Sequence, residues 1–254
     1  RAVVSTRRES AAVFNTLARL IARGEHLPVA AQGLRALPPS AWNAASVTPV
    51  VEALAAWARE VPNRSRNQRD YLATVHTADA LLAVAPPADA TRLRSELRSL
   101  RVARHIIRAV PEEMRYDNNR IVVEAGRPFQ LVFDNPDVMP HNVVVMKPGS
   151  RERIGNLSMT MLPDQLDSAG RSYVPNDPDI LGATRMLEFG QTETLNLTAP
   201  TVEGVYEFVC TFPGHWMVMY GQLIVTADPD TYREQNPPTL TITPPTPAVH
   251  HGTH

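Results

Sequence analysis

The hydrophobic periodicity of this 254-residue chain changes near residue 102, and that change limits the folds open to it. Before it, apolar side chains such as Val13, Leu17 and Ile21 recur at helical spacing. After it, short runs rich in Val, Ile and Phe are separated by turn residues, which is typical of strands. The sequence therefore predicts an α+β chain in which an all-α segment precedes an all-β one.

The first 102 residues are expected to form five short helices. Pro28 opens the second, and Thr48-Pro49 is expected to be the N-cap and first turn of the third. Further apolar stripes begin at Tyr71 and after Asp89. Helices at roughly 20-residue intervals favour stacked helical hairpins of the HEAT type, although no clean repeat is visible.

The expected strands follow, with one interruption between about 151 and 187, and they cover residues 121–124, 129–133, 142–146, 193–197, 204–210 and 221–225. Many short strands with one insertion predict a β-sandwich. Residues 227–254 are rich in Pro and Thr, so we expect an extended tail. The predicted domains are thus 1–102, 103–226 and 227–254.

Composition argues against several classes of protein. No apolar run approaches the roughly 18 residues of a membrane span. Arginine outnumbers lysine by 24 to one, but no basic run is interleaved with aromatic residues, so we expect no nucleic-acid partner. With one cysteine, the chain has no internal disulfide and no CxxC or CxxCH motif.

That cysteine lies in the most informative stretch, Cys210-Thr-Phe-Pro-Gly-His215-Trp-Met-Val-Met219. The stretch stands between two strand-like segments, so a tight loop would present a thiolate, an imidazole and a thioether together. With one more histidine, these groups are the ligand set of a mononuclear type 1 copper site. Zinc could occupy the same ligands.

The second histidine must come from elsewhere in the sandwich. His141 is the candidate, because it stands in Asp137-Val-Met-Pro-His-Asn142 and opens a strand-like segment. The other histidines are poorly placed, because His105 lies near the start of the domain and His250, His251 and His254 lie in the expected tail.

These residues resemble the azurin-like members of the cupredoxin family, which are type 1 (blue) copper proteins. The family's Cys-x4-His-x3-Met spacing is met by Cys210, His215 and Met219, and His141-Asn142 matches its His-Asn pair. The resemblance implies a Greek-key β-sandwich that binds one copper ion. It also implies that His141, Cys210 and His215 are the equatorial ligands and Met219 the weak axial one.

Three further residues acquire roles from the same resemblance. Asn142 and Thr211 would tie the two ligand-bearing segments together, and backbone N–H groups at Asn142 and Phe212 would donate to the cysteine sulfur. Met217 also lies in the loop, so Met217 in place of Met219 is an alternative axial ligand, although its spacing departs from the family pattern.

The predicted function is single-electron transfer through the copper ion, with no catalysis by this chain alone. The order of helical segment and azurin-like domain resembles the C-terminal end of large bacterial multidomain redox proteins. An electron-accepting module of a larger oxidoreductase is therefore one alternative, with a cytochrome c or a dehydrogenase domain as redox partner.

Copper binding and delivery is another alternative, with His250, His251 and His254 as a loading site. A multicopper oxidase or a dinuclear copper site would need further histidines or a second cysteine beside the motif, and the sequence has neither. The resemblance implies a bacterial periplasmic or otherwise extracytoplasmic location.

Overall fold

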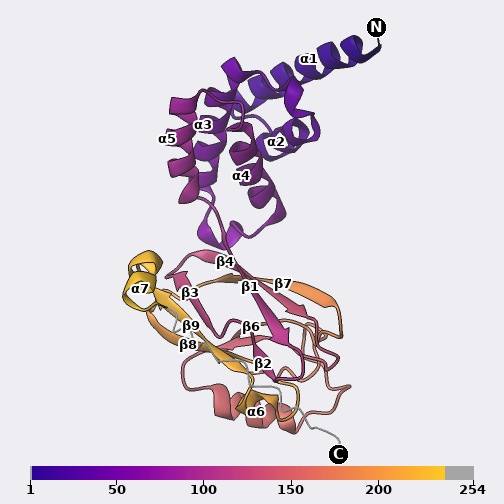
Figure 1. Ribbon diagram of the computed structural model, residues 1–254, viewed down its shortest axis with the longest axis vertical. Helices are drawn as coiled ribbons and strands as arrows, with labels where there is room; N and C mark the ends of the chain where they lie inside the picture. Colours follow the sequence, from indigo (N-terminus) through magenta and orange to yellow (C-terminus); the bar gives the residue numbers. More distant parts are fainter. Residues whose placement is uncertain (1, 238–254) are drawn as a thin grey trace, which may run out of the picture.

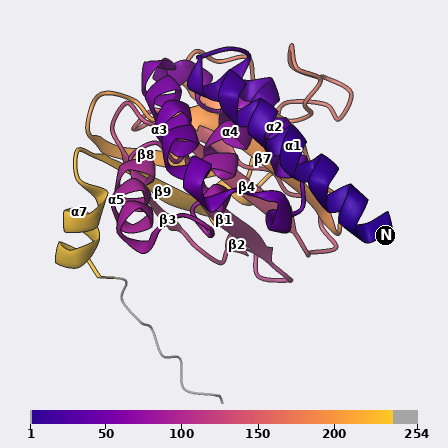
Figure 2. The ribbon, with the colours of Figure 1, turned by 90° about the horizontal axis from the view of Figure 1, so that it is seen from above.

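The structure, a computed structural model, describes residues 2–237. A bundle of helices stands at one end of a two-sheet β-sandwich (Figure 1). Viewed from above, the helices overlie the strands (Figure 2). This arrangement confirms the predicted order of an all-α segment followed by a sandwich.

The helical segment packs around one apolar core. Its helices are α1 (Ala2–Ala22), α2 (Leu27–Ala36), α3 (Ala44–Glu60), α4 (Arg69–Leu81) and α5 (Pro87–Arg98). Phe14, Leu34, Leu54, Leu81 and Leu93 are fully or almost fully buried within it. The five expected helices are therefore present, whereas the HEAT-type stacking stays a prediction.

Helix α3 begins earlier than its sequence suggests. The prediction of Thr48-Pro49 as N-cap and first turn is wrong, because the helix starts at Ala44. The side chain of Asn43 accepts a hydrogen bond from the Ala45 N–H at 3.1 Å and caps the helix one turn earlier. Pro49 consequently lies inside α3, where it removes one backbone hydrogen bond.

The sandwich is built from two sheets with strand orders β2-β1-β4-β7 and β3-β9-β8-β5-β6. The pairs β1–β4 and β3–β9 are parallel, and the other pairs are antiparallel. The strands are β1 (Ala103–Val110), β2 (Arg115–Tyr116), β3 (Arg120–Glu124), β4 (Pro128–Asn135), β5 (Val144–Met146), β6 (Ile180–Ala183), β7 (Gln191–Thr198), β8 (Gly204–Val209) and β9 (Tyr220–Thr226). All six expected strands are present, within a few residues of their expected ends.

Apart from the two-residue β2, two strands escaped the sequence analysis, β1 and β6. In β1 only Ile107 and Ala109 are buried, so its apolar pattern is short and is mixed with arginines. Strand β6 lies in the insertion after α6 (Arg151–Met159) and pairs with β5 through an irregular register. Both pair with strands whose side chains are mostly buried.

The expected extended tail begins with a helix. The prediction of an extended chain from residue 227 is wrong for α7 (Pro229–Gln235). The Asp228 carboxylate accepts hydrogen bonds from the N–H groups of Asp230 and Thr231, and Pro229 occupies the first turn. Of the expected tail, residues 238–254 lie outside the described residues.

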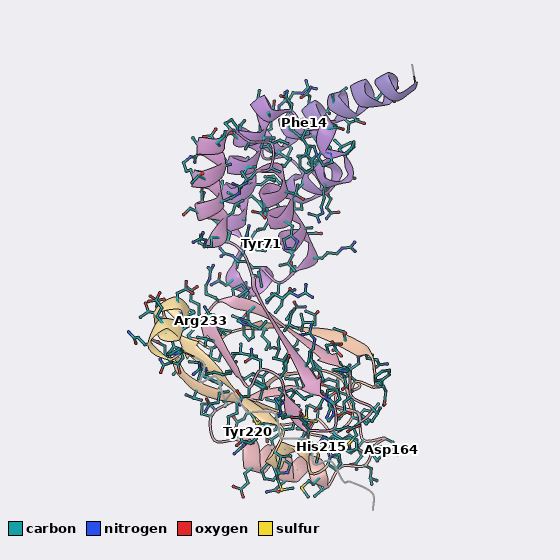
Figure 3. All side chains as sticks on the ribbon, in the orientation of Figure 1. Phe14, Tyr71, Asp164, His215, Tyr220 and Arg233 are labelled. Atoms are coloured by element: carbon teal, nitrogen blue, oxygen red, sulfur yellow. The ribbon has the colours of Figure 1, made fainter. Side chains whose placement is uncertain are left out.

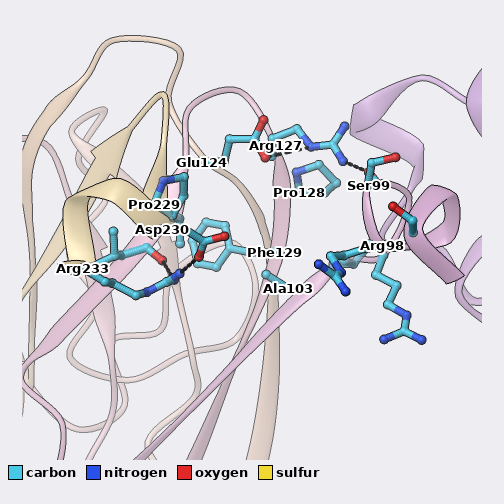
Figure 4. A pocket seen from close by; sticks show the side chains of 15 residues that line it. Arg98, Ser99, Ala103, Glu124, Arg127, Pro128, Phe129, Pro229, Asp230 and Arg233 are labelled. Atoms are coloured by element: carbon cyan, nitrogen blue, oxygen red, sulfur yellow. Dashed lines mark hydrogen bonds and ion pairs between the residues drawn. The ribbon is translucent and has the colours of Figure 1, made fainter. Parts of the chain in front are cut away.

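The junction between helices and sandwich is polar. The side-chain amides of Asn63 and Asn67 donate to the backbone carbonyls of Gly126 and Leu197, at 3.1 and 2.7 Å. Arg127 reaches across the junction to the carbonyl of Ser99 (Figure 4). These bonds hold the helices at the end of the sandwich opposite α6 (Figure 1).

A pocket of about 520 Å³ opens beside this junction. It contains several arginines, but Arg127 pairs with Glu124 at 3.6 Å and Arg233 with Asp230 at 2.9 Å (Figure 4). Much of the positive charge is therefore matched within the pocket wall.

Candidate metal centre

Three donor atoms converge at the α6 end of the sandwich. His141, Cys210 and His215 are 0, 0 and 3% exposed. The Cys210 Sγ lies 3.7 Å from Nδ1 of His141 and 3.6 Å from Nδ1 of His215, and the two Nδ1 atoms are 3.3 Å apart. Within residues 2–237, this is the one buried cluster of its kind.

The triangle of donor atoms has the size that a metal ion requires. A point equidistant from the three atoms lies about 2 Å from each, close to the bond lengths of a transition metal to imidazole and thiolate. Two imidazoles and one thiolate in a plane are the equatorial set of type 1 copper. The residues present therefore fit a single type 1 copper ion.

The loop between β8 and β9 explains how two donors come together. Cys210 directly follows β8, and Gly214 has a φ of 87°, which allows a tight turn before His215. The Cys210 N–H donates to the Met219 carbonyl at 3.0 Å, and the Met219 N–H donates to the His215 carbonyl at 2.7 Å. These bonds close the loop.

The two methionines of the loop have different surroundings. Met219 is fully buried in the same apolar cluster as Cys210, whereas Met217 is 54% exposed. A thioether must lie inside the site to reach a metal, so this difference favours Met219 over Met217 as the axial ligand.

Asn142 and Thr211 connect the two ligand-bearing segments. Asn142 Nδ2 donates to Thr211 Oγ1, and the Thr211 N–H donates to Asn142 Oδ1, each at 2.8 Å. Tyr116 adds a third bond, because its hydroxyl donates to the Asn142 carbonyl at 2.7 Å. All three residues are buried, so these bonds fix His141 relative to Cys210.

The segment before His141 is fixed by two residues to which the sequence analysis gave no role. Asn135 Nδ2 donates to the carbonyls of Met139 and Leu187, at 2.9 and 2.8 Å. The Asp137 Oδ2 lies 3.0 Å from His141 Nε2. The available signal was a carboxylate four residues before a candidate ligand, since metal-binding histidines commonly donate to a carboxylate.

Burial sets the protonation of the donors. It raises the pKa of the Cys210 thiol to about 12, against hydrogen bonds from the backbone N–H groups of Asn142 and Phe212 that lower it. Burial also lowers the pKa of His215 to about 4, which leaves the imidazole neutral and able to bind a metal. A metal ion must displace the thiol proton in order to bind.

The ring of Phe212 packs against His215. The His215 ring centroid lies 4.7 Å from that of Phe212, which in turn lies 5.7 Å from that of Tyr173 in the insertion. Figure 3 shows His215, Tyr220 and Asp164 at the same end of the sandwich. Exposed apolar side chains from loops of this end are Val138, Leu162, Leu166, Met217 and Val218.

The candidate loading site of His250, His251 and His254 lies outside the described residues. Within residues 2–237, no helix is long and apolar enough to cross a membrane.

Residues 105–226 match the sequence model described as copper binding proteins, plastocyanin/azurin family. Auracyanin-A of Chloroflexus aurantiacus is 30% identical over 118 residues, which are 45% of this chain and 68% of that protein. Outer membrane protein H.8 of Neisseria gonorrhoeae is 27% identical over 44% of this chain and 62% of its own length.

Solved structures match about half of the chain. The structure described as auracyanin A, a "blue" copper protein from the green thermophilic photosynthetic bacterium Chloroflexus aurantiacus, is 28% identical with a TM-score of 0.45. The match covers 50% of this chain and all of that one.

Proposed function

This chain belongs to the plastocyanin/azurin family of copper-binding proteins, and we propose that it carries single electrons between redox partners through one type 1 copper ion. We assign the ion to His141, Cys210, His215 and Met219. The observation that carries this assignment is the buried triangle of one sulfur and two Nδ1 atoms with sides of 3.3–3.7 Å.

The residues around the donors give the site a constant shape. Bound copper supplies a one-electron couple. The paired hydrogen bonds between Asn142 and Thr211 hold the His141 segment against the Cys210 loop in either oxidation state. Because the donors move little, little reorganisation accompanies each electron, which suits a carrier.

We place the docking surface for a redox partner over the loops that surround His215. Val138 and Val218 flank the ligands in sequence and are 76 and 56% exposed, so this surface offers apolar contacts. His215 itself is only 3% exposed, so its edge does not form the contact directly. The partner's cofactor would approach over the covering side chains of these loops.

The helical segment is proposed to be a docking or spacing scaffold that contacts a partner outside the surface over His215. It stands at the opposite end of the sandwich from the metal centre (Figure 1). A redox partner such as a cytochrome c, or a dehydrogenase domain of a larger oxidoreductase, could therefore reach the site while the helices bind elsewhere. Unchanged partner kinetics after deletion of residues 1–100 would contradict a role for the helices in docking or spacing.

We propose an extracytoplasmic location in a bacterium, such as the periplasm. The name of one relative, outer membrane protein H.8, supports a place outside the cytoplasm. Copper delivery is the less favoured function, because the three donors are at most 3% exposed and a delivery site must release its ion.

The test is to add Cu(II) to the purified protein and to record visible and EPR spectra, with Cys210→Ser as the variant. We expect an intense blue thiolate-to-copper band with narrow hyperfine splitting in the wild-type protein and neither feature in the variant. A pale spectrum that is identical in both proteins would place the copper on other histidines and overturn the proposal.

A further inference from the structure

One buried carboxylate lies directly behind a proposed copper ligand. Asp137 is 1% exposed, and its Oδ2 lies 3.0 Å from Nε2 of His141. Nδ1 of the same ring points at Cys210 Sγ. The carboxylate and the metal position therefore lie on opposite sides of one imidazole.

The Asp137 carboxylate is held in place without a cationic side chain. It accepts backbone N–H groups of Met139 and Glu112, both at 3.4 Å, and the Asp137 N–H donates to Asn135 Oδ1 at 3.1 Å. Within residues 2–237, no arginine or lysine lies within ion-pair distance, and His141 is its one ion-pair partner. Burying a carboxylate without a cation costs free energy. Because no arginine or lysine neutralises it, its negative charge acts mainly on His141.

The two imidazoles of the site differ in what contacts their Nε2 atoms. No described residue donates to or accepts from Nε2 of His215, whose described contacts are through Nδ1 and the ring face. The carboxylate therefore distinguishes His141 from its partner. General packing of the loop would not require a charged group at this one position.

We propose that Asp137 is a positioning residue that accepts the Nε2–H of His141, presents Nδ1 to copper and lowers the reduction potential of the site. The inference rests on the proposed assignment of copper to His141. Hydrogen bonding to a carboxylate fixes the ring tautomer and makes the imidazole a stronger donor. A stronger donor and a nearby negative charge both favour the more highly charged oxidised ion.

The first test is the reduction potential of the copper-loaded protein, followed through the blue band. Asp137→Asn keeps an oxygen that can accept the Nε2–H but removes the charge. At a fixed applied potential we expect it to shift the Cu(I) to Cu(II) ratio about tenfold toward Cu(I), which is 59 mV for one electron. The matched control is Asp164→Asn, because Asp164 is an exposed carboxylate at the same end of the sandwich and should leave the ratio unchanged (Figure 3).

The second test reads the hydrogen bond itself and needs no copper. In nitrogen-15 NMR of the metal-free protein, His141 is expected to carry its proton on Nε2 with slow solvent exchange. Asp137→Ala should lose that protection. A wild-type His141 protonated on Nδ1, or freely exchanging, would overturn the hydrogen bond.

The two proposals fail in different ways. If the wild-type protein shows no blue band that depends on Cys210, the copper assignment fails. If the band is present but Asp137→Asn leaves the potential where Asp164→Asn leaves it, only the role of Asp137 is overturned. If Asp137→Asn does not fold, the wild-type NMR experiment still decides the hydrogen bond.

Discussion

The indole of Trp216 packs directly against Gly155 in α6. A methyl group on Gly155 would come within 2.3 Å of the indole ring, so no larger residue fits there without movement. The indole N–H also donates to Met159 Sδ at 3.3 Å. Because Trp216 directly follows His215, this contact attaches the helix of the insertion to the ligand loop.

Gly155→Ala should therefore push Trp216 away from α6 and strain the ligand loop. We expect a loss of about 1–3 kcal/mol in the free energy of unfolding, as is usual for overpacked sites. The measurement is urea unfolding followed by Trp fluorescence. Asn156→Ala, at an exposed position of the same helix, is the control, and equal effects of the two variants would contradict this account.

Met219→Leu and Met217→Leu should separate the two candidate axial ligands. Replacing the buried thioether of Met219 should alter the EPR hyperfine splitting and raise the reduction potential, because a weak donor to the oxidised ion is lost. Met217 is 54% exposed, so its replacement should leave both unchanged. The reverse pattern would make Met217 the ligand.

The pair Asn142 and Thr211 should be energetically coupled. Asn142→Ala and Thr211→Val each leave buried polar groups without partners, at a cost of about 1–3 kcal/mol. Thr211→Val removes the bond to Thr211 Oγ1, whereas Asn142→Ala removes that bond and the one from the Thr211 N–H. Because the two changes share one bond, the double variant should lose clearly less than the sum of the single losses. Additive losses in thermal unfolding would show that the bonds do not couple the segments.

His105 should make stability depend on pH. Burial, and to a lesser degree the charge of Arg233, lower its pKa from 6.5 to about 4. Between those values the unfolded chain binds a proton that the folded protein does not, so its contribution is complete above pH 6.5 and is lost as pH falls toward 4.

We expect His105→Gln to flatten the dependence of the urea midpoint on pH between 7 and 4.5. The exposed His76 of α4 offers a matched control in His76→Gln. An identical pH dependence for His105→Gln and the wild-type protein would refute a role for His105.

The sequence predicted the parts of the fold whose side chains repeat regularly. Strands β4 and β8 carry apolar runs long enough to identify, and helices α1 and α4 show clear stripes. Strand β1 is half exposed and carries charged residues, so its identity depends on pairing with β4, which periodicity does not reveal. The start of α3 was decided by Asn43, because a side-chain cap overrode the apparent Thr-Pro signal.

The site residues also fall into those that the sequence predicted and those that it did not. Cys210, His215 and Met219 share one loop, so their spacing in the sequence predicted them as ligands. His141 was predicted because a second imidazole was needed. Tyr116 and Asn135 act through backbone carbonyls that lie 26 and 52 residues away along the chain. Such contacts exist only after the sheets have packed, and a single sequence does not encode them as a recognisable pattern.

The burial of the three donor residues also governs how fast the protein can bind its copper ion. Since His141, Cys210 and His215 are at most 3% exposed, an ion arriving from solvent meets no accessible donor until the loops around them open. The loading rate should then level off at high copper concentration, at the rate of that opening. The same opening limits release, because an ion behind closed loops can leave no faster than the loops open.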